Sequence, residues 1–315
     1  MKILLNYAPS DAHLDALRSA APAATFSIAS GEETARELIA DADAVLGNRY
    51  FLQSIDRARR LRWFQSSSVG MDLVLQARPV LRNITVTNAR GVYSAEMAEH
   101  AVALVFALFR RLHELRDAQV RREWTPRKLE TISGASFLIL GWGSVGSAIG
   151  KRLHALGGNV RGVARNRIIA LDGEEETLAG ATDWRALLPR VDSVVMALPL
   201  TAATRGIVGR EEIARLEPSA TLVNVGRGKT LDETALVAAL TESRVAGAAL
   251  DVFAEEPLDA NSPLWSAPSL LITPHVARSR ETAPPYKWEP LFVENLRRFA
   301  EAKPLINVVD LDREY

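Results

Sequence analysis

Side chains with catalytic chemistry follow three apolar segments in the second half of the sequence. Arg227 comes just after "TLVNVG", Asp251 and Glu256 follow "GAAL", and His275 follows "LLITP". Because the carboxyl ends of parallel strands meet at one edge of an α/β sheet, we expect these side chains along one edge. Arginine binds carboxylates through paired hydrogen bonds, and histidine is the commonest general acid. The set is suited to binding an organic acid and protonating its carbonyl oxygen.

A glycine-rich turn precedes this set. "FLILGWGSVGSAIGKRL" carries Gly141, Gly143 and Gly146 in G-x-G-x-x-G spacing, after an apolar run and at the start of a helical pattern. In this context the glycines allow a tight turn and a close approach to a pyrophosphate, and the helix N-terminus supplies N–H donors. The predicted phosphate-binding residues are Gly141, Gly143, Ser144, Val145 and Gly146.

The next strand should end about 20 residues beyond this turn, where NAD-binding chains place an acidic residue for the ribose hydroxyls. The sequence there is "VARNR", so Ala164 and Arg165 stand in place of the acid. Without the carboxylate nothing repels a 2′-phosphate, and an arginine offers it charge-assisted hydrogen bonds. Arg165, with Asn166 and Arg167 beside it, therefore predicts NADP as the preferred cofactor, with NAD as the alternative.

The two features together indicate a reaction class. Beside a nicotinamide, an arginine that holds a carboxylate and a histidine that protonates a carbonyl oxygen meet the needs of 2-oxo acid reduction. Taken singly, each residue also has a structural interpretation, as an ion-paired arginine, a turn glutamate or a buried histidine. Their joint order along one sheet edge favours catalysis.

The elements that must position these residues alternate between strand and helix. The first 90 or so residues repeat short apolar runs and helical segments, which favours a parallel sheet covered on both faces. Ser94 caps a long apolar helix expected over Ser94–Gln119, and a second series follows it. After residue 280 we expect a helix over Trp288–Ala300, a terminal strand-like "INVVD", and a return to the first domain. The strands expected in the second series are Ser136–Leu140, Asn159–Val163, Ser193–Leu198, Thr221–Val225, Ala246–Leu250 and Leu270–Thr273.

The chain resembles the D-isomer-specific 2-hydroxyacid dehydrogenase family over nearly its whole length. The segments that carry the resemblance occur in the family's order: "SSVGMD", "NARGVYSAEMAEHAVAL", "LGWGSVGSAIG", "LPLTAATRGIVG", "LVNVGRG", "ALDVFAEEPL", "TPHVA" and "NVVD". The resemblance implies an α/β fold of two Rossmann-like domains, with a flavodoxin-like substrate domain built from both termini and an inserted dinucleotide-binding domain. We place the former at 1–92 and 281–315 and the latter at 93–280.

The resemblance also implies roles for individual residues. Arg227 would anchor the substrate, His275 would be the acid/base, and Glu256 would pair with His275. Val69 and Gly70 would offer backbone N–H groups to the substrate carboxylate, while Asp251 would orient the nicotinamide amide. The remaining residues expected at the cofactor are Leu198, Pro199, Thr204, Val225, Gly226 and His275.

Some positions depart from the family pattern or lie outside it. Arg278 stands where the family often has a small residue, and Met97 is larger than usual before the Ala–Glu of the long helix. Arg49 and Tyr50 follow a first-domain strand, where they either set substrate preference or belong to a plain surface loop; we assign them to the substrate. The other histidines fall on helices without metal-ligand spacing, and we predict no metal site and structural or surface roles for them. These are His13, His100, His113 and His154.

Composition narrows the partners. The 315 residues carry 38 basic and 38 acidic side chains, so no global charge favours nucleic acid or an anionic membrane. The absence of cysteine excludes disulfides and thiolate catalysis. No run is long enough to span a bilayer, so we expect a cytoplasmic protein. The family resemblance and the apolar "VALVFALF" face of the long helix predict a homodimer.

The leading hypothesis is an NADPH-dependent reductase that converts small 2-oxo acids of the glyoxylate/hydroxypyruvate type into D-2-hydroxy acids. One alternative is an NAD-linked dehydrogenase for a bulkier D-2-hydroxy acid. Another is a binding protein on the same scaffold that senses the redox state of a dinucleotide. The shape of the substrate pocket decides between the first two.

Overall fold

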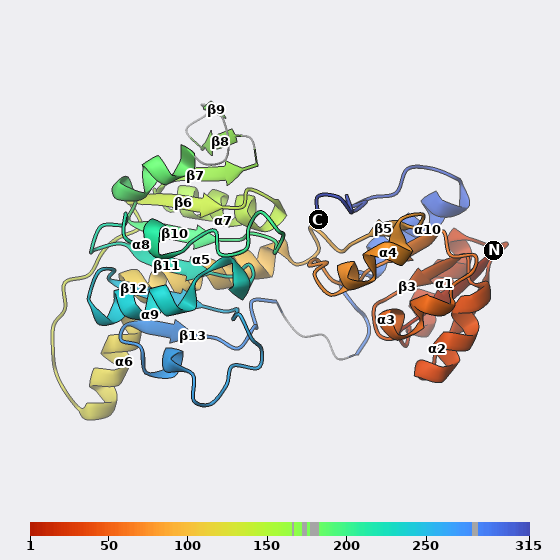
Figure 1. The fold of residues 1–315 in the computed structure, drawn as a ribbon, viewed down its shortest axis with the longest axis horizontal. Coiled ribbons are helices and arrows are strands. Elements are labelled where there is room, and N and C mark those ends of the chain that lie inside the picture. The colour runs from red at the N-terminus through yellow and green to blue at the C-terminus, as the bar shows by residue number, and fades with distance from the viewer. Residues whose placement is uncertain (166, 172–174, 177–182, 279–282) are drawn as a thin grey trace. The chain divides into compact units, whose positions relative to one another are not determined.

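The computed structural model describes residues 1–165, 167–171, 175–176, 183–278 and 283–315. The chain divides into two compact units, and Figure 1 shows that each is built of helices and strands. Unit 1 comprises Met1–Tyr93 and Arg280–Tyr315, and unit 2 comprises Ser94–Ser279. The C-terminal segment therefore packs with the N-terminal residues.

Unit 1 is built on a five-stranded parallel sheet in the order β2-β1-β3-β4-β5. Its strands are β1 (Lys2–Leu5), β2 (Thr25–Ile28), β3 (Ala44–Leu46), β4 (Trp63–Gln65) and β5 (Thr85–Thr87). Its helices are α1 (Asp11–Ala20), α2 (Glu32–Leu38), α3 (Phe51–Ser54), α4 (Arg78–Leu81) and α10 (Glu289–Ala300).

Apolar side chains cover both faces of this sheet. On one face the sheet residues Leu4, Val45 and Phe64 form a core with residues of α2 and α3. On the other face α1 packs against α10, and the ring of Trp63 lies 5.0 Å from that of Phe299. Ser10 caps the N-terminus of α1, because its hydroxyl accepts the N–H of His13.

The end of the chain returns to β5 without forming a strand. The sequence predicts a strand-like "INVVD", but the structure has one antiparallel bridge, between Thr87 and Val308. Asn307 has φ +60°, in the left-handed region. This residue interrupts the extended backbone that a longer ladder needs, so that expectation was wrong.

Unit 2 contains an eight-stranded sheet in the order β13-β12-β11-β10-β6-β7-β8-β9. The pairs from β13 to β7 are parallel, and β7–β8 and β8–β9 are antiparallel. The strands are β6 (Ser136–Leu140), β7 (Asn159–Ala164), β8 (Arg167–Ala170), β9 (Glu175–Glu176), β10 (Ser193–Met196), β11 (Thr221–Asn224), β12 (Gly247–Leu250) and β13 (Leu270–Ile272). All six strands expected in this series are present, and β8 and β9 extend the sheet beyond them.

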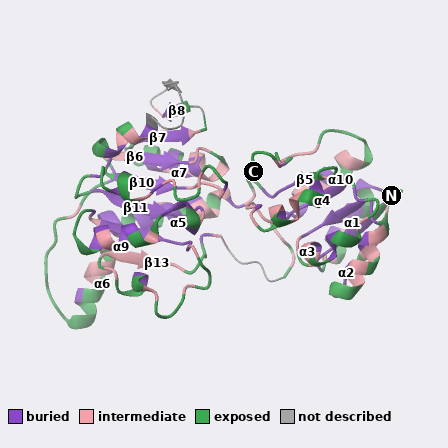
Figure 2. Ribbon diagram, viewed as in Figure 1, coloured by how far each residue is buried: buried purple, intermediate pink, exposed green. Residues whose placement is uncertain are grey.

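Two apolar layers sandwich the sheet of unit 2. Along β6, Leu138 and Leu140 face one layer, while Phe137 and Ile139 face the other. Helices α8 (Arg210–Ile213) and α9 (Glu233–Thr241) cover the first face, and α5 (Ser94–Phe109) and α7 (Ser144–Ala155) cover the second. Figure 2 shows the central strands as buried, as expected for continuous apolar strands in a parallel sheet that is covered on both faces. The fold class predicted from the sequence is confirmed.

The long helix expected over Ser94–Gln119 is two helices. Helix α5 ends at Phe109, and α6 runs from Leu112 to Arg121. Arg111 between them has φ 48° and ψ 37°, in the left-handed region, which ends an α-helix. The break comes where the apolar run stops, so the apolar α5 stays on the sheet and the polar α6 leaves it.

Candidate active site

His275 and Glu256 form a hydrogen-bonded pair in unit 2. The distance between Nδ1 of His275 and Oε2 of Glu256 is 2.7 Å, and Oε1 of Glu256 accepts the N–H of Phe253 at 2.9 Å. Because an ionised carboxylate only accepts hydrogen bonds, Nδ1 of His275 carries a proton. This leaves Nε2 as the ring nitrogen that can exchange a proton with a ligand, and the imidazole is 44% exposed.

The backbone of His275 is held next to β12. His275 has φ +52°, which is unusual for a residue with a side chain. Its N–H donates to the carbonyl of Asp251 at 2.8 Å, directly after the last residue of β12. The histidine therefore projects from a turn that is hydrogen-bonded to the residue after β12.

Asp251 is fully buried beneath this turn. Its carboxylate accepts hydrogen bonds from the Thr273 hydroxyl at 2.7 Å and from the N–H groups of Val276 and Ala277 at 2.9 and 3.0 Å. Burial acts to raise the pKa of Asp251, but hydrogen bonds from His100, Thr273, Val276 and Ala277 together hold the pKa below its usual value. The buried carboxylate is therefore ionised and organises the turn that carries His275.

Arg227 follows β11, two strands away from β13 in the same sheet. Its Nη1 donates to the carbonyl of Gly226 at 2.8 Å, and its own carbonyl accepts from Asn224 Nδ2 and the Thr230 hydroxyl. The side chain is half-buried. Arg227, Asp251 and His275 thus follow β11, β12 and β13, which places them along one carboxyl edge as the sequence indicated.

The glycine-rich turn connects β6 to α7. Gly141 has φ +99°, and a Cβ there would lie 2.7 Å from the carbonyl oxygen of Ala197. A Cβ on Gly146 would overlap the carbonyl oxygen of Gly141, so the turn and the helix touch directly. At Gly143, by contrast, a Cβ would meet no described atom within 4 Å. The backbone is thus open at the N-terminus of α7, next to Ser144 and Val145, and can receive a pyrophosphate there.

The strand after this turn ends in a hairpin. β7 pairs with β8 in antiparallel fashion, with Ala164 opposite Arg167. Arg165 lies directly beyond β7, while the predicted neighbour Asn166 lies outside the described residues. No acidic residue stands at the end of β7, so Arg165 and Arg167 are placed where the second strand of a dinucleotide-binding sheet ends.

The other predicted cofactor residues line two neighbouring strand ends. Leu198 and Pro199 follow β10, and Val225 and Gly226 follow β11. The hydroxyl of Thr204 donates to the carbonyl of Pro199 at 2.6 Å and accepts from the N–H of Thr201 at 2.8 Å. Thr204 therefore fixes the shape of the loop after β10.

The substrate residues predicted in unit 1 lie on two adjacent loops. Arg49 and Tyr50 follow β3, with the Arg49 guanidinium 5.4 Å from the centre of the Tyr50 ring. Val69 and Gly70 lie in the loop after β4, where the carbonyl of Val69 accepts from Asn88 Nδ2 at 3.1 Å. Both loops lie at the carboxyl edge of this sheet. Their contact with a substrate stays a prediction.

Sequence reasoning missed several residues that shape these loops. Asn48 joins the two loops of unit 1, because its Oδ1 accepts the Ser67 N–H at 2.7 Å. Glu233 accepts the Ala254 N–H at 2.6 Å, next to the Glu256 segment, and burial raises its pKa, with a further contribution from Glu255 and Glu256. His100 contacts Thr273. A polar residue just after a strand was a usable signal only for Asn48.

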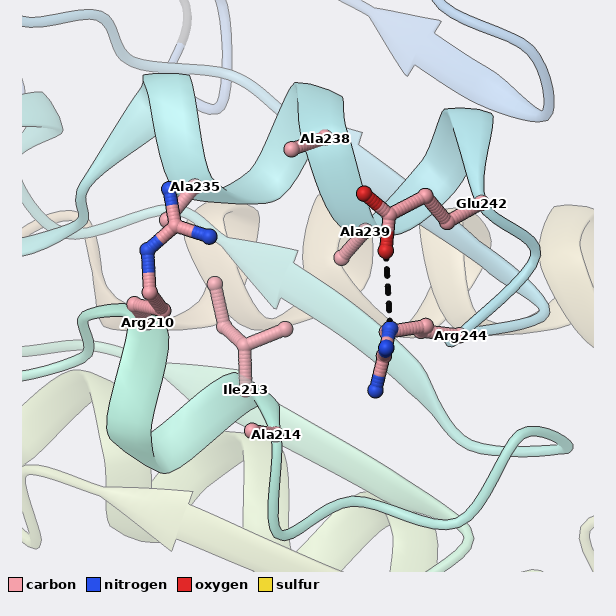
Figure 3. A pocket seen from close by; sticks show the side chains of 8 residues that line it. All are labelled: Arg210, Ile213, Ala214, Ala235, Ala238, Ala239, Glu242 and Arg244. Atoms are coloured by element: carbon pink, nitrogen blue, oxygen red, sulfur yellow. Dashed lines mark hydrogen bonds and ion pairs between the residues drawn. The ribbon is translucent and has the colours of Figure 1, made fainter.

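A small pocket lies elsewhere in unit 2. It has a volume of about 250 Å³ and lies between α8 and α9, as Figure 3 shows, with an ion pair between Glu242 and Arg244 at one side. None of its lining residues is a predicted site residue. Among the described residues no three His, Asp or Glu side chains gather as a metal site would need. No described helix is long and apolar enough to cross a membrane.

Known proteins resemble this chain in both sequence and fold. A family model for the NAD-binding domain of D-isomer specific 2-hydroxyacid dehydrogenases matches residues 102–277. A glyoxylate reductase of Thermococcus gammatolerans is 34% identical over 256 residues, which cover 78% of this chain and 76% of the relative.

Solved structures agree with this match. A D-isomer specific 2-hydroxyacid dehydrogenase from Xanthobacter autotrophicus Py2, in complex with NADPH and MES, superposes with a TM-score of 0.83 at 31% identity and covers 99% of both chains. An NADPH-dependent glyoxylate/hydroxypyruvate reductase from Sinorhizobium meliloti, in complex with NADP and sulfate, has a TM-score of 0.84 at 25% identity and covers 100% of this chain and 99% of its own. The chain therefore belongs to the D-isomer specific 2-hydroxyacid dehydrogenase family and is an oxidoreductase with a nicotinamide-dinucleotide-binding domain.

Proposed function

We propose that the protein reduces small 2-oxo acids of the glyoxylate or hydroxypyruvate type to D-2-hydroxy acids with NADPH. The observation that carries the proposal is the 2.7 Å pair of His275 and Glu256 at the sheet edge that also bears Arg227. The glyoxylate reductase of T. gammatolerans and the S. meliloti reductase support the substrate class.

The residues of unit 2 divide the chemistry among them. When bound, the nicotinamide supplies a hydride to the carbonyl carbon of the substrate. Arg227 holds the substrate carboxylate, and Nε2 of His275 gives its proton to the carbonyl oxygen as the C–O double bond becomes a single bond. Glu256 keeps the Nδ1 proton in place, so the protonated ring is oriented with Nε2 toward the oxygen. Hydride and proton together yield the hydroxyl group.

The cofactor preference rests on the end of β7. Ala164 and Arg165 stand where an acidic residue would accept the ribose hydroxyls of NAD. Arg165 and Arg167 would pair with the 2′-phosphate of NADP, and Asn166 remains a predicted neighbour. The named complexes of the X. autotrophicus and S. meliloti proteins contain NADPH and NADP, which supports the same preference here.

We assign the binding of the substrate side chain to unit 1 and the dinucleotide to unit 2. Val69 and Gly70 would offer backbone N–H groups for the carboxylate, and Arg49 and Tyr50, which follow β3, would set the substrate preference. We also propose a homodimer, since the α5–α6 region bears exposed apolar side chains. These are Phe106, Leu112 and Val120, with Trp124 just beyond α6.

Steady-state reduction of a panel of 2-oxo acids with NADPH and with NADH tests the function. We expect the highest kcat/KM for glyoxylate or hydroxypyruvate with NADPH, and a large loss in His275→Gln. A preference for a bulkier 2-oxo acid with NADH would instead identify an NAD-linked dehydrogenase. Tight NADPH binding without turnover of any acid would support a dinucleotide-sensing protein.

A further inference from the structure

A polar chain that ends at the buried carboxylate of Asp251 runs from α5 to the turn that carries His275. Nε2 of His100 lies 3.0 Å from the hydroxyl of Thr273, and that hydroxyl lies 2.7 Å from Oδ1 of Asp251. The same Nε2 lies 3.4 Å from Oδ1 of Asp251. Residues 173 positions apart in the sequence thus meet around one carboxylate.

The direction of each hydrogen bond follows from counting protons. Thr273 has one hydroxyl proton, and the ionised carboxylate of Asp251 can only accept. The hydroxyl therefore donates to Asp251, and its contact with His100 must be a hydrogen bond that it accepts. Consequently Nε2 of His100 carries a proton, and the order of donation runs from His100 through Thr273 to Asp251.

The receiving carboxylate needs this support. Asp251 has 0% exposure, and a buried charge is costly unless hydrogen bonds compensate it. Thr273, Val276 and Ala277, which all belong to the turn around His275, supply three of these hydrogen bonds. His100 supplies the support from a separate element, α5, which packs against β11 and β12.

The turn itself requires an external hold. His275 adopts the left-handed conformation at φ +52°, and strained backbone of this kind persists only where its surroundings fix it. The carboxylate of Asp251 fixes the turn on the C-terminal side of His275, and the carbonyl of Asp251 accepts the N–H of His275 itself. Anything that shifts Asp251 or Thr273 shifts the ring that pairs with Glu256.

We propose that His100 is a positioning residue for the reaction: through Thr273 and Asp251 it fixes the backbone turn on which His275 presents Nε2. The inference rests on the proposed role of His275 as the acid/base. Neither the glycine-rich turn nor Arg227 takes part, so the expected effect is on the chemical step rather than on substrate affinity.

The test compares variants that keep or remove the donor. His100→Leu and Thr273→Val remove the hydrogen bonds, while His100→Gln and Thr273→Ser keep a donor at nearly the same place. His154→Leu is the matched control, because His154 is exposed on α7. For each protein, kcat and KM for 2-oxo acid reduction are measured together with the melting temperature. The Nδ1–H signal of His275 is followed by NMR in ¹⁵N-histidine-labelled protein without cofactor, and is assigned by its loss in His275→Gln.

We expect His100→Leu and Thr273→Val to lower kcat by about 10- to 100-fold, the usual cost of losing a residue that orients a site ligand. KM should stay near the wild-type value, the His275 signal should shift or broaden, and His100→Gln and Thr273→Ser should recover most of kcat. Unchanged kcat and an unshifted signal in folded Thr273→Val would overturn the inference, as would an equal loss in the Gln and Leu variants of His100. If His100→Leu does not fold, the comparison of Thr273→Val with Thr273→Ser decides whether the hydrogen-bond chain positions His275. If wild-type protein reduces no 2-oxo acid, the proposed function fails, and the NMR comparison still decides the positioning role.

Discussion

Glu256 and His275 lie 19 residues apart in the sequence, yet Oε2 of the one is 2.7 Å from Nδ1 of the other. The second oxygen of Glu256 is occupied by the N–H of Phe253, so the carboxylate has one orientation relative to its own loop. The carboxylate therefore accepts the proton on Nδ1 and directs Nε2 away from the pair. This relationship leads to a prediction about the rate of the reaction.

Glu256→Gln should lower kcat for 2-oxo acid reduction by about 10- to 100-fold, the usual cost of losing a carboxylate that orients a site residue. The amide keeps the shape of the side chain but no longer fixes the proton on Nδ1, so the ring loses the orientation in which Nε2 gives its proton to the substrate. The measurement is kcat for 2-oxo acid reduction under conditions in which chemistry limits the rate. Glu255→Gln is the control and should leave kcat near the wild-type value. A loss of kcat in Glu255→Gln and none in Glu256→Gln would reverse the assignment.

Arg227→Lys should lower kcat/KM for the 2-oxo acid steeply. Lysine keeps the charge but cannot form two parallel hydrogen bonds to a carboxylate. A lost hydrogen bond to a charged group is worth roughly 1.5–3 kcal/mol, which corresponds to about a 10- to 150-fold decrease. The KM for NADPH should remain near wild type, and Arg244→Lys, at an exposed position, should change neither value. A parallel loss of NADPH affinity would count against Arg227 as the substrate anchor.

His13 should make the protein less stable as the pH falls. Its Nε2 lies 2.8 Å from the Tyr7 hydroxyl, and burial lowers the pKa of His13 from 6.5 to about 4. Between these two values the unfolded chain binds a proton that the folded chain does not, so stability is complete above pH 6.5 and decreases as the pH falls toward 4. The loss is on the order of 3 kcal/mol at most. Urea unfolding of His13→Gln should show a weaker pH dependence across this window, whereas His154→Gln should match wild type.

The strands of unit 2 were predictable because parallel, buried strands are continuous apolar runs. β6 and β11 begin at the expected residues, and the chemistry-bearing side chains follow strand ends, which the sequence shows directly. The glycine spacing after β6 likewise has a local cause, since backbone and helix must touch there. Local patterns therefore located both the sheet and the residues along its edge.

Other features depend on contacts that no local pattern encodes. The break between α5 and α6 falls at Arg111, where the apolar run stops but neither glycine nor proline marks the end of the helix. The helical spacing of His100 suggested a structural or surface residue, because its partner Thr273 lies on a distant segment. Asn48 holds the loop after β4 through Ser67, which again joins two separate loops. Such positions become visible only when the elements are placed in space.

The exposed apolar side chains of α5 and α6 lead to a prediction about assembly. Phe106 and Val120 are 37% and 65% exposed, and Trp124 is 96% exposed. Apolar groups gathered in one region usually mark an interface. Multi-angle light scattering should therefore show a homodimer at micromolar concentration, and Val120→Glu with Trp124→Glu should shift it toward monomer. Leu73→Glu, at an exposed apolar residue of unit 1, is the control; a monomeric wild type would contradict the prediction.

The end of β7 should determine which dinucleotide the enzyme prefers. Arg165→Ala removes a charge-assisted partner of the 2′-phosphate. It should raise the KM for NADPH by an amount that corresponds to about 1–3 kcal/mol of lost binding free energy, with little change in the saturated rate with NADH. Ala164→Asp restores a carboxylate at the strand end, where it repels the 2′-phosphate and can accept from the ribose hydroxyls. The ratio of kcat/KM for NADPH to that for NADH should therefore fall in both variants, and further in Ala164→Asp. Arg190→Ala, at an exposed arginine elsewhere in unit 2, should leave the ratio unchanged. If Arg165→Ala weakened both cofactors equally, the arginine would serve the common part of the dinucleotide and not the 2′-phosphate.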